Sequence, residues 1–245
     1  MSKQGEIEYL ENLGSEGKVH AFNKPFSDAD CSRYLIDLGF IMTLLPSSPC
    51  RLLDLGVGTG WTSVFLAKRG YRVTGVDISP QMIALAEKNR ERYEAENLNF
   101  LVSDFEGLTF DREFDCAVFY DSLHHAIDGP KALNSVYKAL KPGGVCITLE
   151  PGAGHSRTQD SRRAIEEFDI TEKDMHPEKV IALAEKTGFK TARIFHFSFL
   201  PTEIRNKTGP YRVVKDKIRQ VFRIARTPGD YTRALSERNL VLMKK

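Results

Sequence analysis

The chain lacks a long apolar run, and no stretch of its 245 residues approaches the roughly 20 residues needed to cross a bilayer. Its four cysteines, Cys31, Cys50, Cys116 and Cys146, lie far apart, without the spacing of a zinc site or a redox pair. Cys116 and Cys146 stand in apolar runs and are predicted to be buried thiols. The first residues are polar and acidic, which is not typical of a secretory signal. The sequence therefore predicts a cytoplasmic protein.

An excess of charge of one sign is also lacking. The 35 lysines and arginines nearly balance the 33 aspartates and glutamates, which leaves a net charge of +2. A charge so close to neutral does not predict a nucleic-acid partner. With 41% hydrophobic and 28% charged residues the composition is that of an ordinary globular protein, and the length suits one α/β domain with room for an insertion.

What the chain does contain, between residues 51 and 150, is an alternation of short apolar runs and amphipathic segments. The expected strands are residues 51–55, 71–77, 98–104, 114–121 and 145–150. The expected helices between them are residues 61–70, 80–96 and 130–140. Ser79 is the expected N-cap of the second helix, with Pro80 at its first position. Strands that alternate with helices pair in parallel, so the pattern predicts a doubly wound α/β sheet.

The two flanks of this region are less regular. Before the first strand, a helix is expected from the N-cap candidate Ser27 up to Pro46. The elements expected after the fifth strand are a polar loop at 152–163, a helix start at Thr171, a helix at 176–189, a strand at 190–199, a long insertion at 201–236 and a last strand at 239–245.

The segment "LLDLGVGTGW", residues 52–61, places three glycines directly after a buried strand. A glycine-rich turn that leads into a helix offers backbone N–H groups to a ligand. The dinucleotide fingerprint would need glycine at position 61, which is Trp61, and the lysine of a phosphate-binding loop is also missing. The loop therefore does not resemble one built for a pyrophosphate.

Carboxylates follow the next two strands. Asp77 ends the second strand, where a carboxylate accepts hydrogen bonds from a ribose diol. Asp104 ends the third, where a carboxylate can accept from an adenine amino group while Phe105 packs on the ring. Because the carboxyl ends of parallel strands meet at one edge of the sheet, these residues are expected to share a site with the glycine loop.

Five motifs in order, "LLDLGVGTG", "VTGVDIS", "VSDF", "FDCAVFYDSLHH" and "ALKPGG", resemble the class I S-adenosylmethionine-dependent methyltransferases over about residues 48–150. The resemblance implies a Rossmann-like, seven-stranded, mostly parallel sheet with helices on both faces. The last strand would be antiparallel and lie between the fifth and sixth strands. It also implies an N-terminal helical lid over residues 1–47 and a methyltransferase domain over residues 48–245.

The resemblance further implies the cofactor S-adenosyl-L-methionine, which leaves as S-adenosyl-L-homocysteine. Asp54 and the glycines would cradle its methionine portion, Asp77 would hold the ribose hydroxyls, and Asp104 and Phe105 would frame the adenine. The cofactor-binding residues expected on this basis are Asp54, Gly56, Val57, Gly58, Gly60, Asp77, Ile78, Asp104, Phe105 and Tyr120.

The transferred methyl group is already activated, so the enzyme has to position a nucleophile and, for a hydroxyl acceptor, remove a proton. Tyr120 and Asp121 follow the fourth strand and are expected near the methyl group. His155 stands in a glycine-flanked loop after the fifth strand and is a candidate general base, with a surface histidine as the equal alternative. His20, His124 and His155 are the candidate substrate-binding residues.

No metal site is expected. His124 and His125 are neighbours in sequence, so on a strand or helix they point in different directions, and neither has a histidine four residues away. His125 is expected to have a structural role.

Residues 210–226 form a basic amphipathic pattern, which indicates a solvated helix face or contact with a membrane surface or lipid-linked anion. Nucleic acid is a weaker third option, because few aromatic residues stand between the charges. The segment "EPGAGHSRTQDSR" and the later "EFDITEKDMHP" resemble methyltransferases that accompany bacterial polysaccharide assembly. The favoured hypothesis is methylation of a hydroxyl on a sugar, glycan or lipid-linked saccharide, in the cytoplasm or at the inner membrane surface. The alternatives are a small-molecule N- or O-methyltransferase of secondary metabolism and a cofactor-binding protein without catalysis. The sequence does not predict an oligomeric state.

Overall fold

The structure is a computed structural model that describes residues 3–195 and 238–245. The insertion predicted at residues 201–236 and the basic segment at 210–226 lie outside the described residues. Of the described helices, none is both long and apolar enough to cross a membrane.

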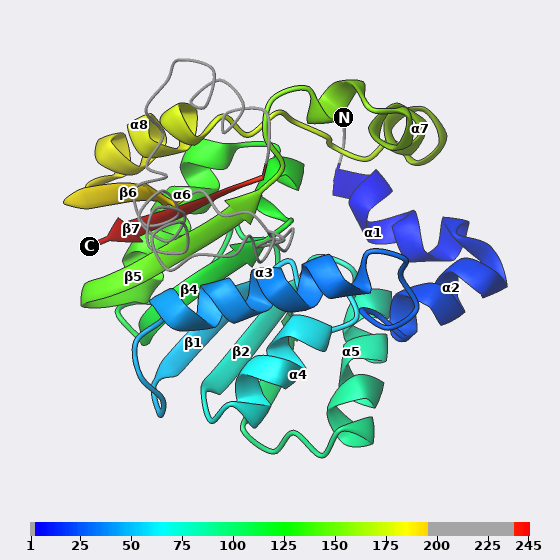
Figure 1. Ribbon diagram of the computed structural model, residues 1–245, viewed down its shortest axis with the longest axis horizontal. Helices are drawn as coiled ribbons and strands as arrows, with labels where there is room; N and C mark the ends of the chain where they lie inside the picture. The colour runs from blue at the N-terminus through cyan, green and yellow to red at the C-terminus, as the bar shows by residue number, and fades with distance from the viewer. Residues whose placement is uncertain (1–2, 196–237) are drawn as a thin grey trace, which may run out of the picture.

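A seven-stranded sheet forms the centre of the molecule (Figure 1). Its strands are β1 (Arg51–Leu55), β2 (Arg72–Asp77), β3 (Leu98–Val102), β4 (Phe114–Tyr120), β5 (Leu140–Glu150), β6 (Thr191–Phe195) and β7 (Asn239–Lys244). The strand order is β3-β2-β1-β4-β5-β7-β6, and among the described strands β7 alone runs in the opposite direction to the rest. This confirms the predicted Rossmann-like sheet, including the antiparallel last strand between the fifth and sixth.

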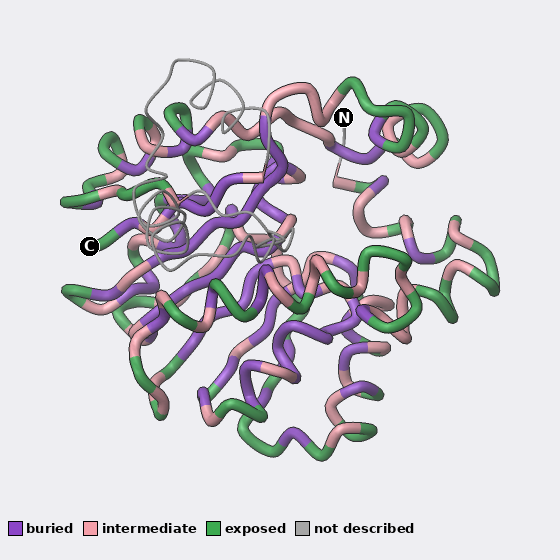
Figure 2. The backbone as a smooth tube through the Cα atoms, in the orientation of Figure 1, coloured by how far each residue is buried: buried purple, intermediate pink, exposed green. Residues whose placement is uncertain are grey.

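The sheet is buried on both faces, as the tube of Figure 2 shows at its centre. Because side chains alternate along a strand, Leu52 packs into the core on one face and Leu53 into the core on the other. Both leucines are fully buried. The burial of all four residues of β1 after Arg51 therefore fits a sheet with helices on both sides.

The described helices are α1 (Lys3–Asn12), α2 (Gly14–Phe22), α3 (Cys31–Leu44), α4 (Trp61–Lys68), α5 (Pro80–Arg92), α6 (Gly129–Ala139), α7 (Gln159–Phe168) and α8 (Pro177–Thr187). Buried residues of α3, α4 and α5 share one core with the sheet, and those of α6 and α8 share the other. Ile41 of α3 is fully buried, so the third helix of the N-terminal segment belongs to the main core.

Helices α1 and α2 are placed differently, near the carboxyl ends of the strands (Figure 1). Ser79, just after β2, donates its hydroxyl to the carbonyl of Ile7 in α1. Thr59, in the glycine loop, donates its hydroxyl to the carbonyl of Ala21 in α2. The first two helices therefore contact the edge of the sheet where the predicted site lies.

Three local predictions were wrong. The third helix begins at Cys31 with Asp30 as its N-cap, rather than at Ser27, because residues 23–30 form turns and a bend after α2. Thr171 starts no helix, since its backbone N–H donates to the Glu6 carboxylate of α1 instead. The polar segment 152–163 holds a short 3-10 turn, His155–Arg157, and the start of α7, whose N-cap Thr158 accepts from Ser161.

Candidate functional site

The glycine loop joins β1 to α4, and its three glycines all have positive φ, at 70°, 53° and 79° for Gly56, Gly58 and Gly60. A Cβ on Gly56 would lie 2.5 Å from that of Ser122, and a Cβ on Gly60 would lie 2.6 Å from the ring of Phe100. A Cβ on Gly58, by contrast, would meet no heavy atom of the described residues within 4 Å. The first and third glycines serve packing, and the middle one presents open backbone.

Asp77 ties the end of β2 to this loop. One oxygen of its carboxylate accepts from the backbone N–H of Gly58 at 2.8 Å, and the other accepts from that of Ser79 at 2.9 Å. Burial raises the pKa of Asp77, although these two backbone donors oppose the shift. Each carboxylate oxygen can accept a further hydrogen bond, so a diol could be held beside Gly58. Ile78 follows directly and is half-buried.

The backbone before Gly58 is held by β2. The N–H groups of Gly56 and Val57 both donate to the carbonyl of Val76, and the Val57 side chain is buried in the core. The loop is thus anchored to two strands before it reaches α4.

The Asp54 carboxylate makes its hydrogen bonds within the protein. It is 1% exposed, and its carboxylate accepts from the hydroxyls of Thr62 at 2.8 Å and Ser63 at 2.6 Å, both in the first turn of α4. Burial raises its pKa, with the two hydroxyls opposing. The structure therefore shows Asp54 orienting the helix after the glycine loop, which is an indirect way to shape a cofactor site.

Asp104, after β3, has three donors. The backbone N–H groups of Glu106 and Gly107 each lie 2.7 Å from one oxygen, and the Lys3 ammonium lies 2.9 Å from the other. Burial raises the pKa of Asp104, but Lys3 and the backbone donors outweigh it, so the pKa lies below its usual value. Phe105 meets Phe119 edge to face at 5.6 Å and lies beside Gly56. Phe105 thus borders the glycine loop, and Asp104 directly precedes Phe105.

Tyr120 is buried and donates its hydroxyl to Asp37 of α3 at 3.0 Å. Burial raises its pKa, and the negative charge of Asp37 raises it further. The hydroxyl therefore stays protonated at neutral pH and acts as a donor, so the structure does not favour Tyr120 as a proton acceptor. Its ring packs edge to face on Trp61 at 5.6 Å.

Asp121 has the left-handed backbone conformation, with φ at 52°, and both its oxygens lie 2.6 Å from one nitrogen of Arg238. Burial raises the pKa of Asp121, but Arg238 outweighs this effect and holds the pKa below its usual value. The Nε atom of Arg238 lies 3.3 Å from Asp37. Asp121 is therefore an ionised partner of an arginine that precedes β7.

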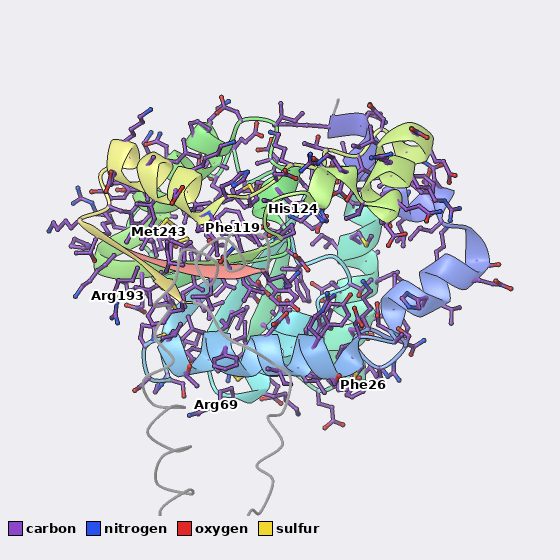
Figure 3. All side chains as sticks on the ribbon, turned by 45° about the horizontal axis from the view of Figure 1, so that its top comes forward. Phe26, Arg69, Phe119, His124, Arg193 and Met243 are labelled. Atoms are coloured by element: carbon purple, nitrogen blue, oxygen red, sulfur yellow. The ribbon has the colours of Figure 1, made fainter. Side chains whose placement is uncertain are left out.

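His124 stands in the 3-10 turn Leu123–His125 after β4 and is buried at the strand ends (Figure 3). Its Nδ1 lies 2.7 Å from the carboxylate of Glu150, the last residue of β5. Glu150 is 2% exposed and also accepts from the backbone N–H groups of Ser122, Leu123 and His124. The ends of two adjacent strands thus fix one imidazole.

Glu172 brings a second carboxylate to this place. Its Oε2 atom lies 2.6 Å from His155 Nε2 and 3.6 Å from His124 Nε2. The His155 loop is held by Asp174, which accepts from the backbone N–H groups of Gly154 and Ser156 at 2.9 Å each. His155 and His124 thus meet at one carboxylate, edge to face with ring centres 5.0 Å apart.

His125 joins the same group. Its Nδ1 lies 2.7 Å from the Thr171 carbonyl and 3.5 Å from Glu6, and its ring centre is 4.0 Å from that of His124. Burial lowers the pKa of His125, but Glu6 and Glu172 outweigh it and raise the pKa to about 9. His20, in contrast, is half-exposed on α2, and its charged partner is Asp28 at 3.9 Å. The structure therefore does not place His20 with the other histidines.

Sequence reasoning missed Glu150, Glu172, Asp37, Arg238 and Lys3. Glu150 carried a usable signal, since a carboxylate at the end of a central strand stands where ligands bind. Glu172 gave none, because it reaches the site from a segment that has no regular structure.

Comparison with known proteins gives a family match for the centre of the chain. A family model described as a methyltransferase domain matches residues 53–148. That range runs from β1 through most of β5 and includes the glycine loop, Asp77, Asp104 and His124.

Two curated relatives show the same region. The chain is 37% identical over 109 residues to the demethylmenaquinone methyltransferase of Thermus thermophilus, which covers 43% of this chain and 49% of that protein. It is 37% identical over 94 residues to a ubiquinone biosynthesis O-methyltransferase of Coxiella burnetii. That match covers 38% of this chain and 40% of the relative. The chain thus spans less than half the length of these relatives.

A solved structure extends the likeness in fold to the whole chain. Phosphoethanolamine N-methyltransferase 2 of Haemonchus contortus has a TM-score of 0.67 and 19% identity, and the match covers 100% of this chain and 60% of that one. At this identity the likeness shows the fold alone. Together the comparisons confirm the resemblance to class I S-adenosylmethionine-dependent methyltransferases, and residues 53–148 match the model of a methyltransferase domain.

Proposed function

We propose that the protein binds S-adenosyl-L-methionine and transfers its methyl group to a hydroxyl of an acceptor molecule. The observation that carries this proposal is the open backbone at Gly58, held beside the Asp77 carboxylate at the carboxyl edge of a methyltransferase domain. Bound cofactor would supply an activated methyl group. Gly58, Asp77 and Ile78 would hold its ribose side, and Asp104 with Phe105 would border its adenine.

A hydroxyl acceptor is favoured by the histidines and carboxylates after β4 and β5. Ser122, whose side chain packs against Gly56, is followed within three residues by His124 and His125. His155 is 26% exposed and therefore open to a substrate, and it is paired with Glu172. An imidazole backed by a carboxylate is suited to accept a proton from a hydroxyl near neutral pH. We assign that role to His155, with Asp121 and Tyr120 as positioning residues.

The acceptor we favour is a sugar, glycan or lipid-linked saccharide. Its support is the sequence after β5, which resembles methyltransferases of polysaccharide assembly. A small aromatic acceptor of the quinone kind is the second candidate, because two relatives are named for demethylmenaquinone and for ubiquinone biosynthesis.

Two measurements test the proposal. Titration calorimetry should show cofactor binding that Asp77→Ala weakens roughly tenfold or more, since a lost pair of hydrogen bonds to a charged group exceeds 1.4 kcal/mol. Unchanged affinity in Asp77→Ala would refute the ribose assignment.

Methyl-labelled cofactor should then be incubated with the protein and acceptor fractions from cells. Label in the lipid or polysaccharide fraction supports a glycan acceptor, and label in quinone precursors supports the second candidate. Cofactor binding without labelling of any fraction would contradict catalysis and leave a binding protein.

A further inference from the structure

The side-chain cluster around Glu172 contains an unusual share of the chain's imidazoles. The chain has six histidines, and three of them, His124, His125 and His155, surround this one carboxylate. One ring nitrogen of His124, one of His125 and one oxygen of Glu172 all lie within 4.8 Å of one another. Imidazole and carboxylate together are the ligands of zinc and related transition metals, whereas magnesium and calcium prefer oxygen alone.

The surroundings of the two neighbouring histidines are those of metal ligands. Histidines that bind a metal donate their other ring N–H to a carboxylate or a backbone carbonyl, which fixes the ring. His124 has such a partner in Glu150 at 2.7 Å, and His125 has one in the Thr171 carbonyl at 2.7 Å. The acceptor Glu150 is itself fixed by three backbone N–H groups. Each ring is therefore left with one nitrogen free of these partners.

The spacing of the donors also fits. In a tetrahedral zinc site with bonds of about 2 Å, the ligand atoms lie roughly 3.3 Å apart. His124 Nε2 and Glu172 Oε2 are 3.6 Å apart, which is close to that spacing, and one donor atom each of His124, His125 and Glu172 lies within 4.8 Å of the others.

The sequence gave the opposite expectation, because adjacent histidines on a helix or strand point apart. Here they stand in a 3-10 turn that leads from β4 into a loop, and their ring centres are 4.0 Å apart. The third donor comes from Glu172, in the extended segment between α7 and α8.

We infer that His124, His125 and Glu172 form a binding site for one divalent transition-metal ion of zinc-like chemistry. An ion there would bind an acceptor hydroxyl and lower its pKa. That role rests on the proposed function, whereas the binding of the ion does not.

The test uses the full chain without a histidine tag, freed of metal by a chelator and titrated with Co²⁺. Wild type should bind one Co²⁺ per chain, with visible absorption bands of a nitrogen and oxygen site, and Zn²⁺ should displace it. Glu172→Gln keeps the shape and removes the charged ligand, so it should weaken binding by roughly 100-fold or more. Glu150→Gln changes only the outer partner of His124 and should weaken binding by roughly 10- to 100-fold.

His176→Ala removes an imidazole outside the cluster and serves as the matched control, with affinity as in wild type. Circular dichroism should show that each variant is folded. If Glu172→Gln does not fold, Glu172→Asp, which draws the carboxylate back from the imidazoles, provides the comparison. Wild type that takes up no stoichiometric Co²⁺, or a Glu172→Gln variant that binds as well as wild type, would overturn the inference.

Methyl transfer measured on the same samples separates the two proposals. Stoichiometric metal binding without methyl transfer to any acceptor supports the site and contradicts the proposed function. Methyl transfer by a protein that binds no metal supports the proposed function and contradicts the metal site.

Discussion

At the scale of single residues, the three glycines of the loop all have a positive φ angle but have different surroundings. Gly56 and Gly60 have side chains within 3 Å of where a Cβ would stand, and Gly58 faces open space. Positive φ explains why all three are glycine, since other residues lose roughly 1–2 kcal/mol in that conformation. Close packing is a second reason for glycine at positions 56 and 60. At position 58 the second reason is access for a ligand.

This difference predicts that Gly58→Ala separates binding from stability. The substitution should lower the free energy of unfolding by about 1–2 kcal/mol, from the positive φ alone. It should weaken binding of S-adenosyl-L-homocysteine by roughly tenfold or more, because the new methyl group occupies the open side of the loop. Urea unfolding and titration calorimetry give the two quantities.

Gly56→Ala is the control for that experiment. It has the same backbone penalty plus a clash with Ser122, so its loss of stability should be larger by about 1–3 kcal/mol. If Gly58→Ala binds like wild type, or if both variants lose the same stability, the distinction between the two glycines is wrong.

At the scale of elements, α1 is held closely against α7. Gly5 of α1 lies so near the backbone that an added Cβ would stand 2.4 Å from the carbonyl oxygen of Phe168. Tyr9 meets the ring of Phe168 edge to face at 5.5 Å, and Glu6 accepts from the N–H of Thr171. These contacts join the N-terminal helix to the segment that carries Glu172.

The close approach predicts opposite effects of the same substitution at two helix glycines. Gly5→Ala should lower the melting temperature and increase hydrogen exchange in α1, since α1 must move away from α7. Gly39→Ala, in α3, meets no described heavy atom within 4 Å and should raise stability by about 0.5–1 kcal/mol. A stabilised Gly5→Ala variant would show that α1 does not pack on α7 in solution.

The elements show where the sequence was informative. The five strands from Arg51 to Glu150 were predicted because their apolar runs are continuous, and the α5 cap at Ser79 because its signal is local. Helix α7 was missed. Only one of its residues, Ser161, is buried, so the helix has little apolar pattern to detect.

The same limit applies to the site. Asp77 and Asp104 were predicted because each follows a strand at a fixed place in the fold. The contact of His124 with Glu172 joins residues far apart in sequence through a segment of irregular backbone, and no local spacing encodes it. The pairing of Asp121 with Arg238 has the same character.

At the scale of the whole molecule, Arg238 joins three parts of the chain. It contacts Asp37 of α3, Asp121 after β4, and the ring of Tyr120, and it directly precedes β7. Burial raises the pKa of Asp37, with Arg238 opposing, while Asp121 has a lowered pKa because Arg238 outweighs its burial. The buried carboxylate of Asp37 and the partly exposed carboxylate of Asp121 therefore both depend on one guanidinium.

Removing this guanidinium should destabilise the fold in a pH-dependent way. Arg238→Met leaves both carboxylates without a cation and should lower the free energy of unfolding by about 3–5 kcal/mol at pH 7. Without Arg238 both folded-state pKa values should lie above their unfolded values, so the folded state binds more protons and is destabilised as the pH rises through that range. The loss relative to wild type should therefore shrink toward pH 5.

Urea unfolding at several pH values measures this effect. Arg193→Met is the matched control, because Arg193 is exposed on β6, and it should change stability by no more than about 0.5 kcal/mol at each pH. A loss for Arg238→Met that is the same at pH 5 and pH 7 would contradict the account.

The position of β7 between β5 and β6 also bears on how the chain folds during its synthesis. In the sheet, β6 has β7 as its described neighbour, and β7 is the last strand along the chain. As residues leave the ribosome, β1 to β5 can assemble first, but β6 has no strand to pair with until residues 239–244 have emerged. Until then the edge of β5 carries unpaired N–H and C=O groups, which are a template for pairing with another chain. Slow synthesis of the residues up to 244 would therefore lengthen the period in which the nascent protein is prone to aggregate.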